Sequence, residues 1–284
     1  IGNCLGNNPA APYIIPTLPL WPDEFVDTKM KDLFGPTAKD TWWTYRLDPR
    51  EAIVVVGLMP PPGAYFGLQS YVFSREGVIN RSDEIYRSVK EPFMRSILFM
   101  NSPNALRPLV FASIGDSNNN VVMERQSGAS FNQDRSLVIT PDAVMERQIA
   151  DALLRTGVPN RNQIFTEPVS ANLVHLGLGQ HADDMITLMR YALPSDEVAG
   201  NKWRRELPLL VFRVRDKNAS RSTEPYPVPV RENHVANSEL SLRGEEDHLV
   251  RAIKEKWRQP KAVAAPFESL FLKVDLFGPS CLKR

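Results

Sequence analysis

The side chains best suited to chemistry lie in two polar stretches between positions 116 and 184. The first stretch contains Asp116 and Ser117, with Glu124 a few residues further on. The second is rich in glycine and contains His175, His181, Asp183 and Asp184. Imidazole and carboxylate groups at such short spacing can bind Zn²⁺, Mn²⁺ or a similar divalent metal ion. The second stretch is therefore a candidate metal site, and a solvated loop is the alternative interpretation.

The segment Gly115-Asp116-Ser117 resembles the nucleophile block of the GDS-type esterases, in which a strand, this tripeptide and a helix expose a serine oxygen. The resemblance implies that Ser117 is a nucleophile, which needs a base such as His175 within hydrogen-bond reach and an acid that orients the base. Asp116 and Glu124 could instead act as a carboxylate pair in glycoside chemistry. The plain alternative is that the polar residues 115–120 form the turn of a β-hairpin.

A second kind of site is suggested by aromatic residues. The run 64–73 predicts a strand, and because side chains alternate along a strand, Tyr65, Gly67, Gln69 and Tyr71 share one face. Tyr65, Gln69 and Tyr71, together with Trp42 and its neighbour Trp43, could line a concave surface that binds a small-molecule or polymer ligand. Packing of these large rings in the core is the alternative.

The elements that must position these residues predict an α+β fold. Apolar runs at 52–58, 64–73, 109–114, 121–126, 135–140, 163–166, 185–193 and 207–214 predict strands, and the first two and the 109–114/121–126 pair are each expected to form a hairpin. The best helix is predicted over 141–156, with Thr140 as N-cap, Pro141 in the first turn and Gly157 as the stop. Two further helices are predicted over 195–206 and about 245–258. We therefore expect a largely antiparallel, curved sheet with a few helices on its outside.

The sequence as a whole predicts one globular domain over 1–284, with a proline-rich strap at 1–25 and a long loop at 216–238. A net charge of +1 argues against nucleic acid as a partner, and no apolar run approaches the length of a membrane span.

Several features favour export. Cys4 and Cys281 could pair in a disulfide, the first residue is Ile1 rather than Met, and Asn80 and Asn218 begin N-x-S/T sequons. The function expected from these patterns is that of an exported, disulfide-bonded glycoprotein enzyme, most simply a hydrolase of a small or polymeric substrate. The alternative is a non-catalytic ligand-binding or structural protein that uses the aromatic sheet face.

Overall fold

The computed structural model describes residues 13–26, 35–77, 79–101 and 106–228, together with His248, Arg251, Ala252 and Glu255. Cys4, Cys281 and most of the helix predicted at 245–258 lie outside the described residues. The chain divides into two compact units, Ile1–Val228 with Asp275–Arg284, and Pro229–Val274. The sheets and helices named below all belong to the first unit.

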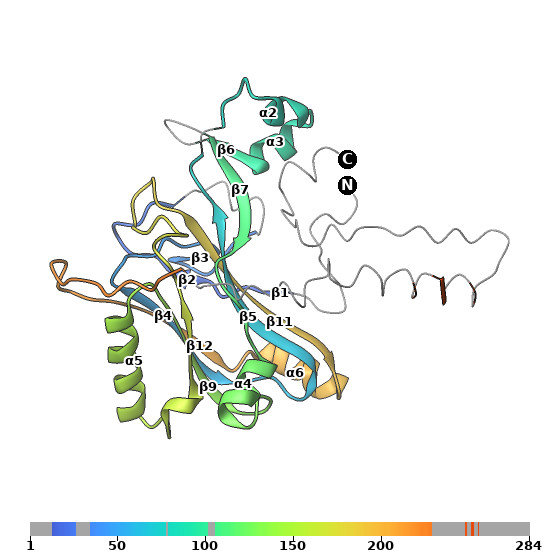
Figure 1. Cartoon of the computed structure of the whole chain (residues 1–284), viewed down its shortest axis with the longest axis vertical. Helices are drawn as coiled ribbons and strands as arrows, with labels where there is room; N and C mark the ends of the chain where they lie inside the picture. Colours follow the sequence, from blue (N-terminus) through green and yellow to red (C-terminus); the bar gives the residue numbers. More distant parts are fainter. Residues whose placement is uncertain are drawn as a thin grey trace. The chain divides into compact units, whose positions relative to one another are not determined.

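One sheet is built around two long antiparallel strands, β5 (Gly63–Ser74) and β11 (Asp184–Pro194). Its strand order is β1 (Tyr13–Ile14), β11, β5, β7 (Leu106–Ser113) and β6 (Phe99–Asn101), and β8 (Asn118–Asn119) also pairs with β5. Every strand pair in this sheet is antiparallel (Figure 1).

A four-stranded sheet has the order β10 (Ile164–Pro168), β9 (Asp134–Thr140), β4 (Glu51–Leu58) and β12 (Leu209–Arg215). Its β9–β10 pair is parallel and its other pairs are antiparallel. A short ribbon of β2 (Leu18–Pro19) and β3 (Thr41–Trp42) accompanies the two sheets. The predicted α+β fold with a curved, largely antiparallel sheet is confirmed.

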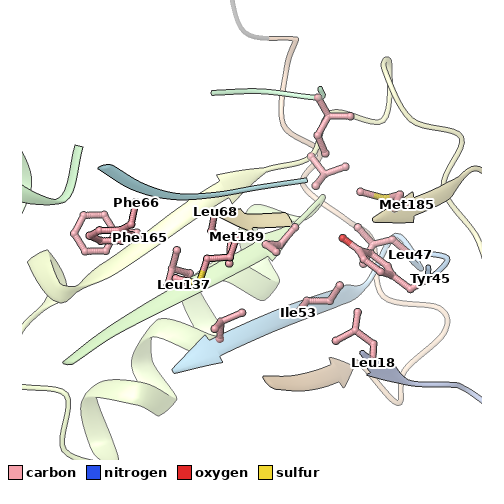
Figure 2. Packing of buried hydrophobic residues seen from close by; sticks show 14 of the residues in the cluster. Leu18, Tyr45, Leu47, Ile53, Phe66, Leu68, Leu137, Phe165, Met185 and Met189 are labelled. Carbon is pink, nitrogen blue, oxygen red and sulfur yellow. The ribbon is translucent and has the colours of Figure 1, made fainter. Parts of the chain in front are cut away.

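The main hydrophobic core contains side chains from both sheets. Phe66 and Leu68 of β5 and Met189 of β11 pack with Ile53 of β4 and Leu137 of β9, and all five are almost fully buried (Figure 2). Because alternate residues of a strand face opposite ways, Tyr65, Gly67, Gln69 and Tyr71 of β5 lie on the face away from this core.

Helix α5 (Ala143–Arg155) packs on the four-stranded sheet, where its Met145 and Ile149 contact the cluster that includes Val54 and Val138 (Figure 1). The helix predicted at 141–156 is therefore confirmed, with a shorter N-terminus. Asp142, rather than Thr140, is the N-cap, because its carboxylate accepts hydrogen bonds from the first-turn N–H groups.

The remaining helices of the described residues are α2 (Glu84–Ser88), α3 (Pro92–Leu98), α4 (Asn120–Ser127) and α6 (Glu197–Glu206). The helix predicted over 195–206 corresponds to α6, with Asp196 as its N-cap. No helix among the described residues is long and apolar enough to cross a membrane.

The strand predicted at 121–126 is wrong, since these residues form α4. The side-chain oxygen of Asn119 accepts hydrogen bonds from the N–H groups of Val121 and Val122, both at 3.0 Å, which starts a helix. Met123 is the one buried residue of this helix. Val121 and Val122 therefore do not alternate between a buried and an exposed face, as neighbouring residues of a strand would. The segment 115–120 is consequently not a hairpin turn but a connection from β7 through β8 to α4.

The hairpin predicted from 52–58 and 64–73 is also wrong, because β4 and β5 belong to different sheets. Prolines at 60–62 supply no backbone N–H donors, so they cannot continue a ladder between the two strands. The carbonyl of Pro60 accepts from Asn132 beside β9, whereas that of Pro62 accepts from Ser195 after β11. The proline turn thus carries the chain from one sheet to the other.

Candidate ligand-binding site

A hollow lies on the outer face of β5 beside Gly67, which has no side chain. Gly67 belongs to a row of paired residues that runs across the four strands β1, β11, β5 and β8. Tyr13 pairs with Arg190, Arg190 with Gly67, and Gly67 with Asn119. The hollow has a volume of about 260 Å³ and is lined by Tyr13, Tyr65, Gly67, Gln69, Tyr71, Leu188 and Arg190. We call it the tyrosine pocket.

Close packing holds the two tyrosines of β5 at the pocket. A Cβ atom on Gly67 would lie 2.4 Å from the hydroxyl of Tyr65, so the absence of a side chain at Gly67 lets Tyr65 lie over it. The ring of Tyr71 stacks on Phe111 with centroids 4.9 Å apart and planes 5° apart. Phe111 has a φ of +46° at an irregularity in the pairing of β7 with β5, a conformation that a bulky residue rarely adopts.

Gln69 connects the pocket to the Gly-Asp-Ser segment. Its amide nitrogen donates to the carbonyl oxygen of Gly115 at 2.6 Å, and its amide oxygen accepts from the hydroxyl of Tyr71 at 3.0 Å. Both polar ends of Gln69 are therefore occupied, and the side chain is fixed in one orientation. The aromatic face and the polar segment 115–120, which are separate in the sequence, meet at this residue.

The surroundings of Tyr71 keep its phenol protonated. Burial, reinforced by the neighbouring Tyr13 and Tyr65, raises the pKa of Tyr71 to about 12, although Arg190 acts in the opposite direction. Arg190 donates to the hydroxyl of Tyr13 at 3.4 Å, and its guanidinium carbon lies 4.9 Å from the centre of that ring. The pocket therefore offers hydroxyl donors and one cation at neutral pH.

A chain of buried polar groups lies on the opposite face of β5. The carboxylate of Glu167 accepts from the backbone N–H of Ser70 at 2.7 Å and from its hydroxyl at 3.0 Å. The Ser70 hydroxyl is 3.0 Å from that of Thr187, which is 2.8 Å from the hydroxyl of Tyr45. Burial raises the pKa of Glu167 to about 7 and also raises the pKa of Tyr45.

The esterase-like residues are not brought together with a base. The hydroxyl of Ser117 accepts from the amide of Asn119 at 3.1 Å, while Asp116 and Glu124 are exposed. Within the described part of the chain, no hydrogen bond or ion pair joins these three residues to His175 or His181. A helix does follow the Gly-Asp-Ser segment, but in the described part of the chain the hydroxyl of Ser117 has Asn119, and no base, as its hydrogen-bond partner.

The candidate metal ligands are divided between two ion-pair groups. Asp183 binds Arg75 at 2.6 Å and accepts from the backbone N–H of His175 at 2.8 Å, while the imidazole Nδ1 of His175 lies 3.6 Å away. Asp184 instead binds the buried Arg46 at 2.9 Å, while His181 contacts Glu76. Among the described residues, no group of three or more His, Cys, Asp and Glu side chains is arranged to hold a metal ion. The predicted divalent-metal site thus gains no support from the geometry.

Three of the predicted ligand-binding residues, Tyr65, Gln69 and Tyr71, line the tyrosine pocket. Trp42 does not, because it is buried in a second core cluster with Phe99 and Ile186. The sequence did not point to Tyr13, Leu188 and Arg190, which reach the pocket only through strand pairing with residues far away in the chain. Alternation along 185–193 places Leu188 and Arg190 on one face, but only the register shows that this face is shared with Gly67.

A larger hollow of about 600 Å³ lies where β4 and β9 meet the C-terminal end of α5. The guanidinium of Arg135 at this hollow donates to the carbonyl oxygens of Asp134 and Ala129 and to the hydroxyl of Ser127, so it already has three acceptors within the protein. The smaller pocket therefore has the better set of convergent polar side chains. Comparisons with models of protein families, with curated proteins and with solved structures found no significant match to this chain.

Proposed function

We propose that this protein is a binding module for a small ligand, which occupies the tyrosine pocket on the outer face of β5. One observation carries the proposal: three tyrosines, a glutamine and an arginine from three strands converge on one hollow on the outer face of β5. Sites of this kind combine apolar and aromatic walls with a few fixed polar groups that orient the ligand.

The size of the pocket suits a compact ligand. Its volume of about 260 Å³ lies just under the roughly 300–1,000 Å³ typical of sites for drug-sized molecules. A compound with one ring can lie against the tyrosine faces and Leu188 while its polar groups reach Gln69 or Arg190. Rings fixed by packing lose little freedom when a ligand binds, which favours affinity.

Binding has more support than hydrolysis. A serine nucleophile needs a base within hydrogen-bond reach, and the one hydrogen-bond partner of the Ser117 hydroxyl in the described residues is the amide of Asn119. The pocket residues themselves include no carboxylate, histidine or cysteine. The groups that converge there can orient a ligand by hydrogen bonds and stacking.

The proposal is tested with a substitution that fills the hollow. In Gly67→Ala the new methyl group would lie 2.4 Å from the hydroxyl of Tyr65, so the ring of Tyr65 must leave its place over residue 67. Gly179→Ala is the matched control, since a Cβ there meets nothing within 4 Å. Saturation-transfer NMR with a set of single-ring aromatic compounds and monosaccharides would identify binders of the native protein.

We expect at least one compound class to bind the native protein and the Gly179→Ala variant, and to lose most of its affinity for Gly67→Ala. Thermal unfolding of each variant verifies that the fold is retained. The proposal fails if every compound that binds does so equally well in all three proteins.

A further inference from the structure

The cationic group of the tyrosine pocket indicates the charge of the ligand. Arg190 is the one charged residue among the described residues that line the pocket, and none of them is acidic. Its guanidinium is stacked against Tyr13 and donates to that hydroxyl, which fixes the plane of the fork. A planar guanidinium matches the two oxygens of a carboxylate.

The remaining polar groups favour the same class of ligand. The hydroxyls of Tyr13 and Tyr65 can donate to an oxyanion, while Tyr71, whose hydroxyl donates to Gln69, contributes its ring. The rings of these tyrosines and Leu188 supply apolar contact area for a planar ring. A small aromatic carboxylate therefore combines the two chemistries that the pocket offers.

A titratable group lies directly beneath this pocket. Glu167 binds the backbone N–H of Ser70, the residue between the two pocket residues Gln69 and Tyr71. The β5 ladder is interrupted there, because β8 pairs with β5 as far as Leu68 and β7 pairs with it from Tyr71. Glu167 of β10 supplies the acceptor for the Ser70 N–H in this interruption. Its carboxylate is therefore separated from the pocket by the strand β5 alone.

Among the residues that the structure describes, Glu167 has no cationic hydrogen-bond partner that would hold it ionised. β5 and β11 present the hydroxyls of Ser70 and Thr187, and the segment before β4 presents Tyr45. The charge of Glu167 raises the pKa values of Tyr71 and Tyr45, whereas the charge of Arg213 lowers the pKa of Tyr45. β8 contributes asparagines, which do not titrate, and β9 presents Ile139 in register with Glu167. Burial without a cationic partner places the titration of Glu167 near neutral pH.

We propose that the tyrosine pocket binds a small aromatic carboxylate through Arg190, and that Glu167 takes up a proton when this anion binds. The inference rests on the proposed ligand-binding function of the same pocket. A negative charge above β5 disfavours a second one below it, so the bound anion stabilises the protonated carboxyl. By linkage, protonation of Glu167 strengthens anion binding to the same extent. Affinity for the carboxylate therefore rises as the pH falls through the titration of Glu167.

The experiment compares two probes of nearly identical shape, benzoate and the neutral benzamide. Isothermal titration calorimetry in two buffers of different ionisation enthalpy reports the protons taken up per ligand between about pH 6 and pH 8, where benzoate stays ionised. We expect benzoate to bind with proton uptake and to lose about tenfold in affinity across this range. Benzamide should bind more weakly, with no proton uptake.

Two variants separate the parts of the proposal. Glu167→Gln keeps an acceptor for the Ser70 N–H and should still bind benzoate, with neither proton uptake nor pH dependence. Arg190→Gln lies on the outer face and should weaken benzoate binding by roughly tenfold or more, and benzamide binding by a clearly smaller factor because only the charge-assisted part of the interaction is lost. Arg190→Gln also provides a test if Glu167→Gln does not fold.

Different results overturn different claims. If benzoate and benzamide bind equally and without pH dependence, and Gly67→Ala weakens both, the ligand-binding function stands and the present inference is wrong. If proton uptake persists in a folded Glu167→Gln variant, Glu167 is not the coupled group. If Gly67→Ala changes the binding of neither probe, they bind elsewhere and the proposal for this pocket fails.

Discussion

Buried charged residues in this protein differ in whether an opposite charge accompanies them. Arg213 of β12 lies between Glu24 and Glu51, at 2.6 Å from each, and all three side chains are at most 1% exposed. Glu167 is equally inaccessible but has only neutral hydrogen-bond partners. Burial raises the pKa of Glu51, but Arg213 opposes that rise, whereas Glu167 has only hydrogen bonds from Ser70 to oppose the effect of burial. In the sequence, Glu167 looks like an ordinary strand residue, because its environment is set by β5 and β11.

The stability of the protein should decrease with rising pH because of Glu167. Its pKa is raised from 4.5 to about 7, so the folded state binds the proton more tightly than the unfolded state. The contribution is fully present below the unfolded pKa and is lost as the pH rises through about 7, at a total of about 3 kcal/mol. Urea unfolding of the native protein and of Glu167→Gln across this pH range isolates the contribution of Glu167 to the free energy of unfolding, because the contributions of the other groups cancel in the difference. A difference that does not change with pH would contradict this account.

Removal of Arg213 should be strongly destabilising. Arg213→Ala leaves two buried carboxylates without their cation, which typically costs about 3–5 kcal/mol. Arg215→Ala, two residues further along β12, breaks a pair with the exposed Asp23 and should cost about 1 kcal/mol or less. Chemical denaturation of both variants measures the contrast, and equal losses would show that Arg213 has no special structural role.

The secondary-structure elements were predictable where local signals agree. The helix at 141–156 and the strands at 135–140 and 185–193 are confirmed, because caps, periodicity and β-branched runs all indicate the same structure. Local signals failed at 121–126. The valine pair there suggested a strand, but Asn119 caps the segment and it forms a helix. Local signals also failed at the 60–62 prolines, because a turn between two strands does not reveal whether those strands pair.

The cap of α4 can be tested by substitution. Asn119→Ala removes the acceptor for the N–H groups of Val121 and Val122 and should lower stability by about 1 kcal/mol. Asn119→Asp keeps a capping oxygen and should retain most of that stability. Thermal unfolding followed by circular dichroism compares the variants, and identical midpoints for Asn119→Ala and the native protein would exclude the cap.

At the scale of the whole molecule, the sequence predicted those residues of the tyrosine pocket that lie on one strand, but not those that other strands contribute. Tyr65, Gln69 and Tyr71 share a strand, so alternation alone groups them. Tyr13 and Arg190 join them only through the antiparallel register of β1, β11 and β5, which depends on long-range packing. The sequons at Asn80 and Asn218 are both exposed, and the predictions of export and glycosylation remain to be tested by mass spectrometry of the protein from its native source.

The most direct test of the binding site is a two-dimensional amide NMR titration of the native protein with benzoate. The account predicts that the largest shifts occur at Gly67, Gln69 and Arg190, whose backbones surround the tyrosine pocket on β5 and β11. Shifts centred on Gly57 and Ser136, beside the larger hollow at the end of the four-stranded sheet, would contradict it.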